Sequence, residues 1–190
     1  GATLILLLWA GGRGPAEKAL DAQDRAALEK MAAEAAQAAE TRPNDAEAQY
    51  KSAYGHSLLA QLGIELGDKP LGRHAAETGI KYAQRATALK PASSEFHRIL
   101  GTLCGQIIPA NVMAGLKYGK CAMDEVAKAI ELDKSSSNNW LSRGVGNYYL
   151  PAAFGGGVTL AVQDFEKAVD LDPKSAEAQL WLGIALRKSG

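Results

Sequence analysis

One pattern near the carboxyl end of the chain restricts the possible folds more than any other feature. In the segment LAVQDFEKAVDLDP, Ala161, Phe165, Ala168 and Pro173 stand at offsets typical of the second helix of a paired-helix repeat. Small residues let two helices approach closely, the aromatic ring fills the space toward the next pair, and proline ends the helix. The pattern therefore predicts helix hairpins stacked in a line, each burying its apolar face on its neighbours.

The same ending occurs three more times toward the amino end of the chain. RATALKPASSEF contains it with Ala86 and Pro91, and AAQAAETRPNDAEAQ contains it with Pro43. AIELDKSSSNNW contains it with Ala129, and Lys134 stands there in place of proline. Successive endings are 48, 43 and 39 residues apart, whereas the regular repeat has a period of about 34 residues.

The additional residues fall between the two helices of each pair. They lie in QLGIELGDKPLGR, in IIPANVMAGL and in YYLPAAFGGGVTL, and each segment contains glycine or proline. We therefore expect longer hairpin turns or helix extensions at these places. Since insertions at one corresponding place in every repeat lie along one edge of a stack, that edge is a candidate binding surface.

These residues resemble the tetratricopeptide repeat (TPR) superfamily over about residues 25–190, most closely over 122–186. The insertions and AKAIELDKSSSNNWLSRGVGNYY are loosely similar to the regulator-of-microtubule-dynamics type and to uncharacterised bacterial TPR proteins. The resemblance implies an all-α, right-handed alpha-alpha superhelix of antiparallel helix pairs, whose first helices line a concave groove. It also implies a scaffold or adaptor that binds extended peptides or partner helices.

We expect a single TPR-like domain of about four helix pairs followed by a capping helix. The expected repeats are residues 2–43, 44–91, 92–134 and 135–173, with the capping helix at 174–190. The expected first helices after the opening repeat are residues 45–66, 93–108, 137–150 and 175–188. The last helix has no second partner, so it either caps the apolar end of the stack or begins a pair whose second helix is missing.

Counting along three of the first helices places twelve residues on the concave face. They are Glu47, Tyr50, Tyr54 and Ser57, then Glu95, Arg98, Thr102 and Gly105, then Asn138, Leu141, Val145 and Tyr148. Tyrosine and arginine give large contacts at modest entropic cost. We therefore predict that Tyr50, Tyr54, Arg98, Asn138 and Tyr148 bind a partner, the alternative being a solvated groove without function.

The third insertion adds two further candidate residues, Tyr149 and Phe154. Together with Tyr148 they give one segment three aromatic rings, next to a proline and a run of glycines. The segment is either a binding loop folded over the end of the groove or a long turn held by its own aromatic packing. The glycines are not a phosphate-binding loop, because no Gly-Lys-Ser/Thr follows them.

The sequence favours a non-catalytic interaction scaffold that binds a peptide or partner segment in the groove. The alternative is a small-molecule or lipid-binding protein whose pocket is closed by the long insertions. No catalytic motif is present, so we do not expect an enzyme. We expect no cofactor and no metal, since no pair of His or Cys has ligand spacing. Positive and negative residues balance at 21 each without a basic cluster, so a nucleic-acid partner is not expected.

Two features concern the surroundings in which the chain works. Cys104 and Cys121 are interpreted as buried, reduced thiols; a disulfide, which would fit an oxidising compartment, is the alternative. The apolar run Ala2–Ala10 is shorter than the about 20 residues of a membrane span. We read it as a buried helix that ends at Gly11–Pro15, and no integral span is expected. Removal of an upstream signal would make the protein periplasmic or secreted; otherwise it would be cytoplasmic.

Overall fold

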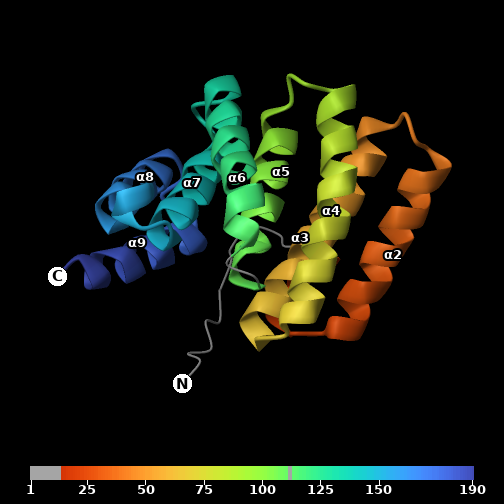
Figure 1. Ribbon diagram of the computed structural model, residues 1–190, viewed down its shortest axis with the longest axis horizontal. Helices are drawn as coiled ribbons and strands as arrows, with labels where there is room; N and C mark the ends of the chain where they lie inside the picture. Colours follow the sequence, from red (N-terminus) through yellow and green to blue (C-terminus); the bar gives the residue numbers. More distant parts are fainter. Residues whose placement is uncertain (1–13, 111–112) are drawn as a thin grey trace.

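The computed structural model describes residues 14–110 and 113–190, and within these residues the chain contains nine α-helices and no strand. The helices are α1 (Pro15–Asp21), α2 (Arg25–Thr41), α3 (Ala46–Leu66), α4 (Lys69–Leu89), α5 (Ser94–Gln106), α6 (Ala114–Leu132), α7 (Ser137–Tyr149), α8 (Val158–Leu171) and α9 (Ala176–Ser189). Figure 1 shows them in chain order from α2 to α9 as a linear stack. The predicted all-α, TPR-like solenoid is confirmed.

Helix hairpins are the repeating unit of the stack. α3 pairs with α4, α5 with α6 and α7 with α8, while α2 packs on α3 and α9 packs on α8. The expected first helices correspond to α3, α5, α7 and α9, and their ends agree within two residues. The helix predicted over residues 2–10 lies outside the described residues. Pro15, which the sequence assigned to a helix stop, occupies the first turn of α1, where its missing N–H costs little.

The first insertion forms helix rather than loop. Gly67, with a φ of 70°, ends α3 in the left-handed conformation, and Asp68 caps α4 through the backbone N–H of Leu71. The two helices then cross in close contact, because a Cβ on Gly63 would lie 2.4 Å from the backbone nitrogen of Gly72. The other insertions contain short 3₁₀ segments, η1 (Ile108–Ala110) and η2 (Ala152–Phe154).

Each junction between successive hairpins is closed by a side chain at the fourth residue of the following first helix. This side chain bonds a carbonyl oxygen of the preceding turn or helix end, which no backbone N–H of the helix can reach. The pairs are Gln49 with Ala39 at 2.8 Å, His97 with Pro91 at 2.9 Å, Trp140 with Lys134 at 2.9 Å, and Gln179 with Pro173 at 2.7 Å. The same position therefore bonds the chain just before each of these helices, in the turn at three junctions and in the end of α2 at the first.

Cys104 and Cys121 form a disulfide that joins α5 to α6, so the expectation of two reduced thiols is wrong. Their Cα atoms lie 6.0 Å apart although 17 residues separate them in sequence. The reason lies in the hairpin, which brings facing positions of its two helices together. The bond closes the stretch of chain that contains the second insertion.

We expect reduction of this disulfide to lower the free energy of unfolding by about 3 kcal/mol, because the unfolded chain then loses a closed loop of this length. Denaturant titration with and without a reductant measures the effect. The Cys104→Ala/Cys121→Ala variant should start from the lower stability and show no response to reductant. Identical midpoints for the wild-type protein in both conditions would contradict the prediction.

Candidate binding surface on the concave face

The first helices form the inner layer of the solenoid. Each contacts the next along the stack, α3 with α5, α5 with α7, and α7 with α9. The predicted concave residues are the second, fifth, ninth and twelfth residues of α3, α5 and α7. The same positions on α9 hold Glu177, Leu180, Ile184 and Arg187, which the sequence prediction left out. We call this set of positions the inner face.

The structure brings three predicted site residues, Tyr50, Tyr54 and Arg98, into one polar cluster. Arg98 binds Glu95 through two bonds, Nε to Oε2 at 2.7 Å and Nη2 to Oε1 at 2.5 Å. Tyr50 donates its hydroxyl to the same carboxylate at 2.8 Å. Tyr54 donates to Glu17 of α1 at 2.5 Å, and the two tyrosine rings stack with centroids 6.0 Å apart. The polar side-chain groups of this cluster are therefore already bonded within the chain.

Burial controls the chemistry of the two tyrosines in this cluster. Loss of hydration raises the pKa of the Tyr50 hydroxyl far above its ordinary value, and the negative charge of Glu95 raises it further. Burial also raises the pKa of Tyr54, and the hydrogen bond to Glu17 raises it further. Both hydroxyls therefore remain protonated hydrogen-bond donors and are poor candidates for proton transfer near neutral pH.

Two other predicted residues, Tyr148 and Tyr149, surround Trp181 at the α7–α9 end. Their ring centroids lie 5.6 Å and 6.1 Å from that of Trp181, whose other neighbour Phe165 lies at 5.8 Å. Tyr149 nevertheless remains 69% exposed. Aromatic packing thus holds the end of α7 against α9, while much of Tyr149 stays exposed to solvent.

Phe154 and Asn138 lie apart from both groups. Phe154, in η2, is 72% exposed. Asn138 is exposed at the second position of α7. Its neighbour Asn139 is fully buried and donates to Ser94 Oγ at 2.8 Å and to the carbonyl of Ala129 at 3.0 Å. The amide that makes structural contacts here is therefore that of Asn139, and Asn138 stays a candidate contact residue.

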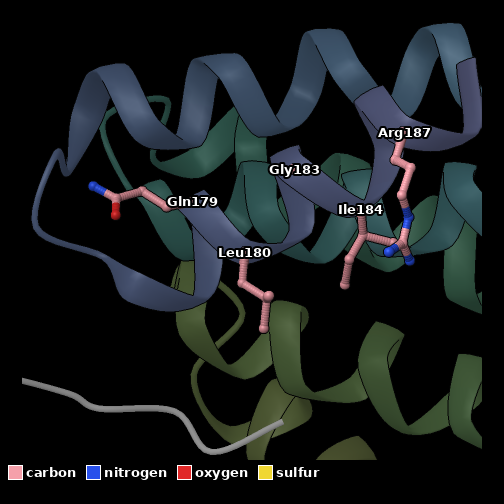
Figure 2. A pocket seen from close by; sticks show the side chains of 5 residues that line it. All are labelled: Gln179, Leu180, Gly183, Ile184 and Arg187. Carbon is pink, nitrogen blue, oxygen red and sulfur yellow. The ribbon is translucent and has the colours of Figure 1, made fainter. Parts of the chain in front are cut away.

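An open pocket lies on the inner face of α9, where sequence reasoning had placed no site. It is lined by Gln179, Leu180, Gly183, Ile184 and Arg187. Figure 2 shows the side chains of Leu180, Ile184 and Arg187 on one side of α9, turned toward helices from earlier in the chain. A Cβ on Gly183 would meet no atom within 4 Å, so the missing side chain leaves space there. The signal was present in the sequence, because the α7 register continues onto α9.

Arg187 differs from the other inner-face arginine in its charge environment. The guanidinium of Arg98 lies 2.5 Å from its carboxylate partner, and that of Arg143, beside the inner face, lies 2.6 Å from Asp164. Arg187 has no ion pair with any residue that the structure describes. The pocket therefore combines two aliphatic side chains with a positive charge that is free to bind an anion.

The described residues carry little that suggests metal or proton chemistry. Residues 14–110 and 113–190 hold no group of three or more His, Cys, Asp or Glu side chains that could bind a metal ion. His56 is buried on α3, where loss of hydration lowers its pKa, and His97 lies at a hairpin junction. None of the described helices is long and apolar enough to span a bilayer.

Comparison with solved structures supports the fold. The chain is similar to the HusA haemophore from Porphyromonas gingivalis, with a TM-score of 0.69 and 20% identity over 94% of this chain and 97% of that chain. It is also similar to MamA, a TPR-type solenoid, with a TM-score of 0.50 and 18% identity over 94% of this chain and 86% of that chain. No protein-family model and no curated protein matches the sequence. At these identities the likeness shows a TPR-like helical repeat fold.

We expect the two partly buried tyrosines, Tyr50 and Tyr54, to make the protein sensitive to alkali. Because folding raises their pKa, the stability they contribute is present below the ordinary tyrosine pKa of about 10 and is lost as the pH rises above it. The Tyr50→Phe/Tyr54→Phe variant should therefore lose less stability between neutral pH and the alkaline range. Denaturant midpoints measured across that range provide the test, and parallel curves for the two proteins would contradict it.

Proposed function

We propose that the chain is a non-catalytic binding protein that holds a segment of a partner protein on its inner face, mainly at the α7–α9 end. One observation carries the proposal: three residues that line the open pocket on α9, Leu180, Ile184 and Arg187, occupy positions that continue the inner face of the preceding repeats. Leu180 and Ile184 offer it an apolar wall.

The opposite end of the inner face is less suited to direct contact. A ligand that bonded Tyr50, Tyr54 or Arg98 would first have to displace Glu95 or Glu17. Breaking such a partly buried bond without full replacement costs up to about 1–3 kcal/mol. We therefore assign these three residues to the wall of the groove, where they support a bound segment through their shape.

The openness of the pocket favours a protein segment over an enclosed small ligand. Small-molecule sites commonly bury about 70–90% of the surface of their ligand. The α9 pocket is open to solvent and lies along one helix. An extended segment can bury one side chain there and continue along the groove. Peptide recognition by helical grooves uses contacts of this kind.

The disulfide bears on where such binding takes place. Disulfides form and persist in oxidising compartments and are rare where thiols are kept reduced. The Cys104–Cys121 bond therefore supports the periplasmic or secreted alternative over the cytoplasmic one. A binding protein in that setting would meet its partner outside the cytoplasm.

A second candidate function is the binding of a small apolar ligand, and the likeness to HusA favours it. That protein is a haemophore, and the likeness spans 97% of its length. In this chain the exposed rings of Tyr149 and Phe154 are the groups that could cover such a ligand. None of the three histidines occupies an inner-face position, so these residues offer no imidazole ligand to a haem iron there.

The peptide-binding function predicts that a larger side chain in the α9 pocket weakens peptide binding. Short peptides are first selected on the wild-type protein from a random displayed library. Gly183→Leu should then weaken the selected peptides at least about tenfold, because the new side chain occupies their space. Gly119→Leu on α6 is the matched control, since a Cβ there also meets no atom within 4 Å. Both variants should keep wild-type helicity, and equal peptide affinities for the two would contradict the proposal.

Two further measurements distinguish the peptide-binding function from the small-ligand function. If the inner face binds peptides and not tetrapyrroles, hemin titration followed by visible absorbance should give no saturable 1:1 complex. Native mass spectrometry of the freshly purified protein should likewise show no retained small ligand. A saturable complex that weakens in the Tyr149→Ala/Phe154→Ala variant would replace the peptide function by the small-ligand function.

A further inference from the structure

We propose that Arg187 is the anion-binding residue of the α9 pocket, and that the partner segment carries an Asp or Glu side chain beside an apolar side chain. The inference rests on the proposed peptide-binding function and names the chemistry of its ligand. The apolar side chain would contact Leu180 and Ile184, and the carboxylate would bind the guanidinium.

The spacing along α9 sets the arrangement of the ligand. Ile184 and Arg187 are three residues apart, which corresponds to about 4.5 Å along a helix axis. Figure 2 shows the side chains of Ile184 and Arg187 on the same side of α9, and both line the pocket. An extended peptide advances about 3.3 Å per residue. The carboxylate should therefore lie one or two residues from the apolar side chain that enters the pocket.

Charge supplies the argument for an acidic group. Arg187 lines the pocket without an ion-pair partner among the described residues. A guanidinium presents a planar fork that matches a carboxylate with two parallel hydrogen bonds. The aliphatic wall formed by Leu180 and Ile184 excludes water from one side of such a pair and strengthens it.

The acid is assigned to a side chain rather than to a peptide terminus. The pocket is open, so the bound chain can pass along it and does not have to end there. A competing role for Arg187 is stabilisation of the last turn of α9, where a positive charge interacts favourably with the helix dipole. Lysine preserves that role and the charge but lacks the planar fork. The two roles can therefore be separated by substitution.

The test uses peptides selected on the wild-type protein and resynthesised with acetylated and amidated ends. We expect each to contain Asp or Glu within two residues of an aliphatic or aromatic side chain. Replacing this acid by its amide should weaken binding to the wild type about tenfold. The same replacement should have no effect on Arg187→Gln, and it should have an intermediate effect on Arg187→Lys. Thermal unfolding of both variants shows whether α9 remains stable.

Four outcomes would overturn the inference. Selected peptides could lack the acid, the acid-to-amide change could cost as much on Arg187→Gln as on the wild type, or binding could require a free carboxyl terminus. In each of these cases Gly183→Leu would still block the peptides, so the proposed function would stand and only the assignment to Arg187 would fall. Selection of no peptide at all would remove the proposed function together with this inference.

Discussion

Close packing of helices at alanine is the constraint on which the rest of the structure depends. Ala39, Ala129 and Ala168 are fully buried near the ends of α2, α6 and α8, and Ala161 is buried to the same degree at the start of α8. Larger residues at these positions would force the hairpins apart, since cores tolerate little added volume. Because each hairpin buries its apolar face on its neighbours, these contacts decide the spacing of the first helices. They thereby position the inner face.

The residues that the structure describes form two hydrophobic clusters, and the inner face divides in the same way. One cluster includes buried residues from α1 to α5, and the other belongs to α7, α8 and α9. Polar contacts lie between them, where Asn139 bonds Ser94 and the Ala129 carbonyl. Arg98 lies near Ser142 in the same region, with Nη1 3.4 Å from Oγ. The saturated cluster around Glu95 therefore lies on one side of this junction, and the α9 pocket lies on the other.

Sequence periodicity predicted the all-α, TPR-like solenoid, because small residues and helix-ending prolines recur for a single physical reason. It did not reveal the junction position, since Gln49, His97, Trp140 and Gln179 share only an N–H donor. The disulfide was considered only as the alternative to reduced thiols, because a spacing of 17 residues has meaning only once the facing sides of α5 and α6 are known. Tyr50, Tyr54 and Arg98 were expected on one face. The sequence did not reveal that Glu95 and Glu17 already accept the hydrogen bonds of these side chains. Those bonds depend on side-chain geometry and on a helix, α1, that no sequence pattern indicated.

The two ends of the inner face differ in chemistry. Under the proposed function they therefore contribute unequally to binding. At the α3–α5 end, buried bonds between chain residues resist exchange with a ligand, so this end is a rigid wall. At the α7–α9 end, Leu180, Ile184 and Arg187 have unmet capacity for apolar and ionic contact. A ligand should therefore gain most of its binding energy at the last helix, as interfaces commonly depend on a few residues. Under this proposal α9, expected from sequence as a cap that only shields the end of the core, carries the main recognition surface.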